Sequence, residues 1–470
     1  MSDVNATEYV KALMQRARAA QKIAESYTQE QVDKLCTAIT WAAVKEENAR
    51  KIAKLAYEES QMGYEEAKYI KLQIKPRGAL RDMKGQKSVG IIEEIPEQGL
   101  VKYAKPIGVI GGIVPCTNPE ATPVVKSMSA IKGRNAIIFA PHPRTAKTNA
   151  LICEVMRAAL KKHGAPEDLI LYIDAENLKL HGLDATSELM KQCDLIVATG
   201  GGALVHAAHS SGTPAYGVGA GNVVTIIDET ADIADACEKV TRSKTFDYAT
   251  SCSADNNIMV KDTVYDAAIA GLKSNGGYLC TAQEKAKLQA VMFLPDGHLN
   301  PKSGLAAASP QAIAGAAGFA VPEGTKFIMV ESTGAGAQHP FSGEKLSIVL
   351  NVYKYTDFEK AIDFLNEIHE WSGKGHTCAI HSTDEKRIDM LAKRTYTSRM
   401  IVRLPTSAAN SGNWFNGLPF SMSLGCGSWG GNSTTENITW RHLINVTWVS
   451  SPIPLTTPKD EDLFGDIMND

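Results

Sequence analysis

The feature that most constrains the fold of this chain is an alternation of short apolar runs with longer amphipathic segments. The apolar runs occupy residues 106–115, 135–140, 169–173, 195–198 and 223–227. Segments with helical spacing separate them at 123–131, 145–162 and 203–211. Short runs that are apolar throughout are typical of strands buried on both faces of a parallel sheet. The pattern predicts a doubly wound parallel α/β sheet that the run at 223–227 completes.

The segments on either side of this region predict further elements. Residues 5–85 have helical periodicity, with a capping box at Thr28 and Gln31, and residues 88–105 have the pattern of a β-hairpin. A second α/β series follows, with its clearest strands at 257–260, 327–330, 347–352 and 377–381, and another strand is predicted at 444–449. We therefore expect domains at 1–231, 232–428 and 429–470.

Composition excludes several classes of protein. The 470 residues are 44% hydrophobic and 21% charged, with a net charge of −3, so we expect no nucleic-acid partner. No apolar run is long enough to span a bilayer, and residues 1–20 lack a secretory apolar core. Nine cysteines without a Cys-x-x-Cys pair argue against a metal site and fit a reduced, cytoplasmic setting. The acidic tail at 459–470 is either a docked or frayed terminus or a short partner-binding helix.

Cys252 is the candidate nucleophile. It lies in a run of small polar residues, which is typical of an accessible thiol and favours the reactive thiolate. An ordinary loop cysteine is the alternative.

Polar residues also follow two of the predicted strands, at the sheet edge where open α/β folds bind ligands. The amide of Asn118, after Thr117, suits an oxygen that becomes negative, although an Asn before Pro is commonly a turn residue. His142 and Arg144, around Pro143, suit a ribose and a phosphate, or are plain loop residues.

A glycine-rich turn at Thr199, Gly200 and Gly201 lies between a predicted strand and a predicted helix. Glycines there let the backbone approach a pyrophosphate at the helix N-terminus. The turn lacks the G-x-G-x-x-G spacing, and tight packing of the strand against the helix explains it equally well.

Together with later motifs, these segments resemble the CoA-acylating branch of the aldehyde dehydrogenase superfamily. The motifs that carry the resemblance are Thr117-Asn118-Pro119, Pro141-His142-Pro143-Arg144, Ala198-Thr199-Gly200-Gly201, Tyr216-Gly217-Val218-Gly219-Ala220-Gly221-Asn222, Ser251-Cys252-Ser253, Gly375-His376-Thr377 and Leu424-Gly425-Cys426-Gly427-Ser428-Trp429-Gly430. The resemblance implies a Rossmann-type nucleotide-binding domain, an α/β catalytic domain and a small oligomerisation β-hairpin.

The resemblance also implies roles. Cys252 would attack the aldehyde, Asn118 and the Cys252 N–H would hold the oxyanion, and His376 would handle the thiol of coenzyme A. NAD or NADP would lie against Thr117, His142, Pro143, Arg144, Thr199, Gly200, Gly201, Gly219 and Glu344. As an alternative, Glu344 is a solvated charge. Strands equivalent to 88–105 and 444–449 make subunit contacts in the superfamily, so we expect a homodimer or a higher homo-oligomer.

One absence favours acyl transfer to coenzyme A. Hydrolytic relatives carry a glutamate base in the segment equivalent to 217–222, and this chain has no carboxylate there. A hydrolytic aldehyde dehydrogenase, a cysteine acyltransferase without redox chemistry and an inactive scaffold remain alternatives. The chain departs from the residues common in such relatives at Asp255 and Ile348, so the resemblance does not determine the substrate pocket.

The expected substrate is a short aldehyde. Ser251, Ser253 and the hydroxyl- and amide-rich segment that begins at Arg403 are the predicted lining. Such a lining suits an anionic aldehyde, such as sulfoacetaldehyde or succinate semialdehyde, although Arg403 is equally a candidate surface residue.

Overall fold

Four helices form the N-terminal part of the chain, in agreement with the helical periodicity predicted for residues 5–85. The computed structural model describes residues 5–469. The helices are α1 (Ala6–Ala24), α2 (Gln29–Val44), α3 (Glu46–Ser60) and α4 (Glu65–Met83). Thr28 and Gln31 form the predicted capping box of α2. The buried face of α4 is unusual, because it carries Lys68, Lys71 and Lys75.

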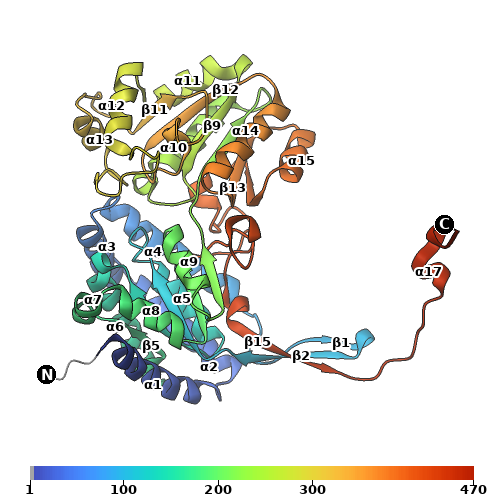
Figure 1. Ribbon diagram of the computed structural model, residues 1–470. Coiled ribbons are helices and arrows are strands. Elements are labelled where there is room, and N and C mark those ends of the chain that lie inside the picture. The colour runs from blue at the N-terminus through green and yellow to red at the C-terminus, as the bar shows by residue number, and fades with distance from the viewer. Residues whose placement is uncertain (1–4, 470) are drawn as a thin grey trace.

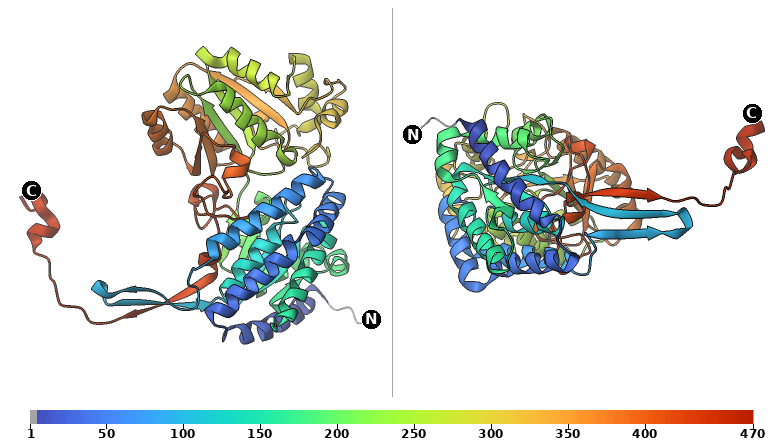
Figure 2. Two further views of the ribbon diagram at one scale, coloured as in Figure 1. Left: turned by 180° about the vertical axis from the view of Figure 1, so that it is seen from behind. Right: turned by 90° about the horizontal axis from the view of Figure 1, so that it is seen from below.

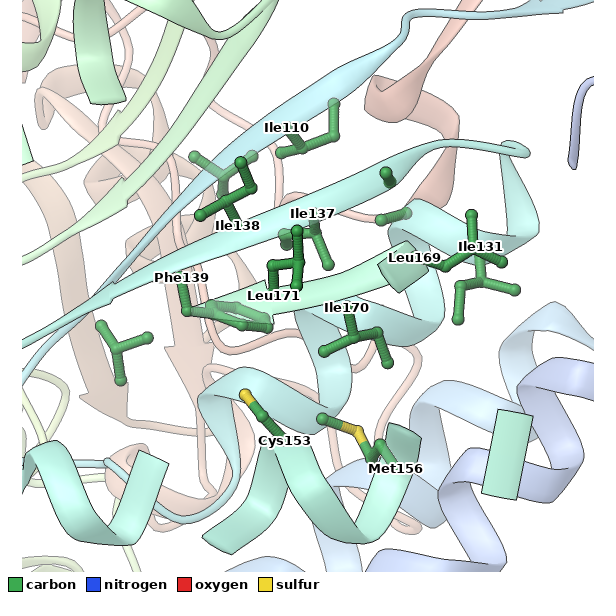
Figure 3. Packing of buried hydrophobic residues seen from close by; sticks show 14 of the residues in the cluster. Ile110, Ile131, Ile137, Ile138, Phe139, Cys153, Met156, Leu169, Ile170 and Leu171 are labelled. Atoms are coloured by element: carbon green, nitrogen blue, oxygen red, sulfur yellow. The ribbon is translucent and has the colours of Figure 1, made fainter. Parts of the chain in front are cut away.

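A five-stranded parallel sheet forms the core of the first α/β body. Its order is β5-β4-β3-β6-β7. The strands are β3 (Val109–Val114), β4 (Ala136–Pro141), β5 (Ile170–Tyr172), β6 (Leu195–Thr199) and β7 (Ala215–Val218). The helices are α5 (Thr122–Lys132), α6 (Ala146–Lys162), α7 (Ala175–His181), α8 (Leu183–Gln192) and α9 (Gly202–His209). Figure 3 shows Phe139 and Ile170 of the sheet above Cys153 and Met156 of α6, all fully buried. This packing explains why the strands are apolar throughout.

A seven-stranded parallel sheet forms the second body. Its order is β10-β11-β12-β9-β8-β13-β14. The strands are β8 (Val223–Ile227), β9 (Asp255–Lys261), β10 (Gly277–Leu279), β11 (Phe327–Glu331), β12 (Val349–Tyr355), β13 (Gly375–His381) and β14 (Thr397–Val402). The helices are α10 (Ile233–Thr245), α11 (Tyr265–Ser274), α12 (Ala282–Met292), α13 (Pro310–Ala316), α14 (Phe358–Trp371), α15 (Glu385–Arg394) and α16 (Thr406–Ala409).

The prediction that residues 223–227 complete the first sheet is wrong. This run is β8, and it lies between β9 and β13 in the seven-stranded sheet. The edge of the first sheet is instead β7, which ends at Val218. The first predicted domain boundary, at residue 231, therefore falls after a strand of the second body. A run buried on both faces does not encode its neighbours, so its periodicity could not assign it to a sheet.

A three-stranded antiparallel arm projects from the first body (Figures 1 and 2). It consists of β1 (Gly90–Ile95), β2 (Leu100–Pro106) and β15 (Ile444–Ser450), so the predicted hairpin pairs with the predicted C-terminal strand. Val446, Trp448 and Val449 of β15 are exposed. The chain then runs along the arm to the short helix α17 (Asp460–Phe464), which makes the C-terminal tail an exposed extension.

Among residues 5–469, no helix is both long enough and apolar enough to cross a bilayer.

Candidate active site

A cavity of about 660 Å³ opens where the two bodies meet, and both bodies line it. The first body contributes the loops that follow β3, β4, β6 and β7 at their carboxyl ends. The second body contributes residues 250–253, Glu344 and the segment around residues 407–413. The carboxyl edge of a parallel sheet is where open α/β folds bind ligands, so the cavity is the candidate site.

Cys252 and His376 meet in this region. The Nε2 atom of His376 lies 3.2 Å from the Sγ atom of Cys252, and its Nδ1 atom lies 2.9 Å from the Thr377 hydroxyl. Burial, followed by the charge of Glu344, raises the pKa of the Cys252 thiol to about 12. Burial, with the nearby charge of Arg399, holds the pKa of His376 well below its usual value. The pair is therefore a thiol beside a neutral imidazole, which contradicts the prediction of surroundings that favour a free thiolate.

The segment before Cys252 adopts an unusual turn. Asp247, Tyr248 and Ala249 all have positive φ, at 51°, 49° and 58°. Such backbone costs about 1–3 kcal/mol per residue and persists only when its surroundings hold it. The Asp247 carboxylate provides that hold, because it accepts hydrogen bonds from the Tyr64 N–H at 3.1 Å and the Thr250 hydroxyl at 2.6 Å. These contacts position the turn that leads to Cys252.

A cluster of buried ion pairs also holds Asp247. The carboxylate lies 2.8 Å from Lys68 Nζ and 2.7 Å from Lys71 Nζ, and Lys71 Nζ lies 2.9 Å from Glu120. All four side chains are at most 7% exposed. Burial opposes the charges of Asp247 and Lys71, but Lys71 and Lys68 lower the pKa of Asp247, and the carboxylates of Asp247 and Glu120 raise the pKa of Lys71. Burial, with the nearby charge of Lys71, lowers the pKa of Lys68. Asp247 and Lys71 therefore favour their charged forms.

Asn118 lines the cavity and contacts the same cluster. Its Oδ1 atom accepts a 2.7 Å hydrogen bond from Lys71 Nζ, and its Nδ2 atom donates to the Thr117 hydroxyl at 3.2 Å. Within residues 5–469, the backbone N–H of Cys252 donates to no protein acceptor. The amide of Asn118 and this N–H are therefore two donors available to a reacting oxygen.

Most of the predicted cofactor residues lie together in the cavity wall. These are Thr117, His142, Pro143, Thr199, Gly200, Gly201, Gly219 and Glu344. Helix α9 begins after Gly201, which has no side chain to cap the first N–H groups, and a Cβ added at Gly201 or Gly202 would meet open space. This end of the cavity therefore has backbone donors and room for a dinucleotide phosphate.

Glu344 is a partly buried carboxyl group in the wall of the cavity. Its Oε1 atom accepts a 3.1 Å hydrogen bond from the Gly221 N–H. Burial raises the pKa of Glu344 to about 7, which that hydrogen bond and Lys345 only partly oppose. An acceptor held in this way suits a ribose hydroxyl.

Two predicted residues do not reach the cavity. Arg144 donates to the carbonyl of Ser60, and the Arg403 guanidinium donates to the carbonyl of Ser382 at 3.1 Å. Neither side chain lines the cavity. Loop residues next to a site along the chain need not point into it, and here both guanidinium groups bind backbone carbonyls instead. The predicted Ser251 and Ser253 do line the cavity, and their hydroxyls lie 2.8 Å apart.

The structure adds three cations that sequence reasoning missed, namely Lys71, Lys75 and Arg242. Lys75 Nζ donates to the Gly412 carbonyl at 2.7 Å, and burial lowers its pKa to about 7. Arg242, in the last turn of α10, is exposed, and its guanidinium makes no hydrogen bond or ion pair within the described part of the chain. The spacing of Lys68, Lys71 and Lys75 along one face of α4 was the available signal for the two lysines, and Arg242 had no such signal.

The described residues contain no cluster of His, Cys, Asp and Glu side chains suited to a metal ion.

Comparison with known proteins identifies the class that this fold and site define. The model of the aldehyde dehydrogenase family matches residues 2–279. The chain belongs to this family, and the resemblance found in the sequence is confirmed.

Within the aldehyde dehydrogenase family, similar proteins include acylating enzymes. The chain is 47% identical to the acylating sulfoacetaldehyde dehydrogenase of Bilophila wadsworthia, over 96% of this chain and 97% of that protein. It is 40% identical to the acetylating succinate-semialdehyde dehydrogenase of Clostridium kluyveri, over 93% and 94%. The crystal structure of an acetylating aldehyde dehydrogenase from Geobacillus thermoglucosidasius matches with a TM-score of 0.91 and 37% identity, over 97% of this chain and 98% of that one. The predicted α/β fold is confirmed.

Proposed function

We propose that this protein oxidises a short anionic aldehyde to its acyl-CoA thioester, with a nicotinamide cofactor as the hydride acceptor. The observation that carries the proposal is the 3.2 Å approach of His376 Nε2 to Cys252 Sγ beside a cavity with two open oxyanion donors. A nucleophile, a base and a pair of oxyanion donors together define acyl transfer through an enzyme thioester.

The first step joins the aldehyde to the enzyme. The Cys252 sulfur bonds to the carbonyl carbon, and the thiol proton passes to His376 Nε2. The new oxyanion accepts hydrogen bonds from Asn118 Nδ2 and the Cys252 N–H. A nicotinamide cofactor held against Gly200, Gly201 and Glu344 would supply the acceptor for the hydride that the former carbonyl carbon loses. What remains on Cys252 is a thioester.

The second step releases the acyl group. His376, once it has lost its proton to solvent, accepts the proton of the incoming coenzyme A thiol. The coenzyme A sulfur then attacks the thioester carbonyl, and Cys252 leaves as a thiolate that is reprotonated. The same base therefore serves both thiols, which agrees with the role that sequence analysis gave to His376.

Release by water lacks a base in the segment where hydrolytic relatives carry one. Residues 217–222 contain no carboxylate. The absence of a base that could activate water there supports the acylating reading over the hydrolytic one.

The cations of the cavity support an anionic substrate. Lys71 is paired with carboxylates, and Lys75 donates to backbone carbonyls. Of the lysines and arginines that line the cavity within residues 5–469, Arg242 is the one whose charge is free to pair with a substrate. A guanidinium suits a sulfonate or a carboxylate. With the 47% identical relative, this favours sulfoacetaldehyde over succinate semialdehyde.

The cofactor is NAD or NADP. Arg144, the predicted partner of a 2′-phosphate, donates to Ser60 and does not line the cavity. The predicted partner of a 2′-phosphate is thus absent from the cavity wall, which favours NAD.

The arm supports a homo-oligomer. An antiparallel sheet with exposed apolar side chains on an outer strand is suited to pair with a second copy of this chain. Light scattering should give at least the mass of a dimer, and Val449→Asp should lower it. A monomeric wild type would contradict this part of the proposal.

A substrate panel tests the function. Sulfoacetaldehyde, succinate semialdehyde and acetaldehyde are each supplied with NAD or NADP, with and without coenzyme A, and products are identified by mass spectrometry. We expect sulfoacetyl-CoA as the main product and no turnover by Cys252→Ala. Free acid at full rate without coenzyme A would establish the hydrolytic alternative, and acyl transfer without reduction of the cofactor would establish the non-redox one.

A further inference from the structure

We infer that Lys71 is a positioning residue for the oxyanion donor: its ammonium fixes the amide of Asn118 so that Nδ2 faces the reacting carbonyl. The inference rests on the proposed function, because it assigns Asn118 the role of holding the oxyanion. It adds a residue of α4 that sequence analysis did not single out.

The first argument concerns the two ends of the amide. An asparagine amide is nearly symmetric in shape, so its environment must decide which end is the donor. A lysine ammonium only donates, and Lys71 Nζ lies 2.7 Å from Asn118 Oδ1. The flipped amide would set an NH₂ group against the ammonium and lose a charge-assisted hydrogen bond. Lys71 therefore determines which end of the amide faces the substrate.

The other end of the amide keeps a free hydrogen. Nδ2 donates one hydrogen to the Thr117 hydroxyl at 3.2 Å, and an amide nitrogen carries two. Asn118, Lys71 and Cys252 all line the same cavity. The second hydrogen is available to an oxygen that becomes negative there.

The ammonium itself is held rigidly. Lys71 is 7% exposed and lies 2.7 Å from Asp247 and 2.9 Å from Glu120. A donor fixed by two buried carboxylates cannot follow a moving amide, so the amide must take the orientation that the donor sets.

Lys71 also connects the oxyanion donor to the nucleophile. Asp247 is the first residue of the left-handed turn that leads to Cys252. Lys71 binds both the carboxylate of Asp247 and the amide of Asn118. One side chain therefore sets the position of the donor relative to the segment that carries the sulfur.

Lys68 provides a matched control. It is as deeply buried as Lys71, lies 2.8 Å from Asp247 and donates to the Thr117 carbonyl at 3.1 Å, but it makes no hydrogen bond to Asn118. Loss of the Lys68 charge disturbs the same cluster of ion pairs, but the Asn118 amide keeps its hydrogen bond from Lys71.

The experiment is a double-mutant cycle on kcat. Lys71→Met, Asn118→Ala, the double variant and Lys68→Met are assayed for coenzyme A-dependent turnover, with unfolding in urea to measure stability. We expect Lys71→Met to lower kcat about 100-fold, as the loss of one oxyanion donor does, with KM for the aldehyde within about threefold. Added to Asn118→Ala, it should lower kcat less than about threefold further. Lys68→Met should lose stability comparably and keep kcat within about fivefold.

Two outcomes would overturn the inference. In the first, the fold-losses in kcat of Lys71→Met and Asn118→Ala multiply in the double variant. In the second, kcat of Lys71→Met is no lower than kcat of Lys68→Met. If Lys71→Met does not fold, Lys71→Met with Glu120→Gln, compared with Glu120→Gln alone, keeps the buried charges balanced and answers the same question. Wild-type products report the proposed function separately, because a wild type that makes no acyl-CoA fails that proposal whatever the cycle shows.

Discussion

The imidazole of His376 lies 3.2 Å from the sulfur of Cys252, although the two residues belong to different segments of the second body. Burial raises the pKa of one partner and lowers the pKa of the other, so the resting pair carries no charge. A neutral thiol is a weak nucleophile, and it needs a base at the moment of attack.

His376→Asn should therefore slow acylation about 100- to 10,000-fold, because a positioned general base typically contributes this much. Rapid mixing with excess enzyme, followed as cofactor reduction at 340 nm, isolates this step. His369→Asn is the matched control, since His369 is equally buried but bonds the Asn222 carbonyl at 3.0 Å and has no contact with Cys252. Equal losses in the two variants would contradict the assignment.

The same pair predicts the pH dependence of thiol alkylation. Without a base, the rate should follow the thiolate fraction and rise about tenfold per pH unit towards a pKa of about 12. Wild type should rise less steeply, because His376 can accept the proton below that pH. Parallel profiles for wild type and His376→Asn, measured with iodoacetamide from pH 6 to pH 10, would show that the imidazole does not assist.

The raised pKa of Glu344 predicts that the free energy of unfolding depends on pH. Burial raises its pKa from 4.5 to about 7, so the folded protein holds a proton that the unfolded chain releases above pH 4.5. The free energy of unfolding should therefore fall as pH rises from about 4.5 to 7 and stay lowered above it. Glu344→Gln removes this effect and should be more stable than wild type at pH 8, by up to about 3 kcal/mol. Urea unfolding at pH 5 and pH 8 tests it, and an equal difference at both values would contradict it.

The buried ion pairs of Asp247 predict that an isosteric substitution of this residue strongly lowers the free energy of unfolding. Asp247→Asn leaves Lys68 and Lys71 with one anion fewer and weakens the hold on the left-handed turn. Breaking a buried ion pair in this way typically lowers the free energy of unfolding by about 3–5 kcal/mol. Urea unfolding measures the loss, and Asp262→Asn, which removes a partly exposed surface pair with Lys261, should change the free energy of unfolding much less. Comparable losses would show that the buried cluster contributes no more than a surface pair.

Local periodicity was sufficient to predict most individual elements. The helical character of residues 5–85, the hairpin and most strands of both sheets came from spacing that one segment carries by itself, whereas β7, β10 and β14 were not predicted. Periodicity could not predict the sheet to which residues 223–227 belong, because β8 would be buried on both faces in either sheet. Pairing is decided by neighbours that are distant along the chain.

The site divides in the same way. Cys252, Asn118 and His376 were found because they lie in motifs whose order is specific. Lys71 and Arg242 lie in helices without a motif, and their roles depend on how α4 and α10 pack against the cavity. Buried charges need partners, and the structure supplies carboxylates for Lys68 and Lys71 but backbone carbonyls for Lys75.

The two candidate arginines give the sharpest test of the substrate. Sequence analysis chose Arg403, whereas the structure brings Arg242 to the cavity with its guanidinium unpaired within residues 5–469. Arg242→Met should lower kcat/KM for sulfoacetaldehyde about tenfold, the effect of one partly exposed charge-assisted hydrogen bond, and should leave acetaldehyde within about twofold. Arg403→Met should change the ratio of the two substrates little, because its side chain lies outside the cavity. If instead Arg403→Met lowers that ratio and Arg242→Met does not, the anionic group binds elsewhere and the choice from sequence was the better one.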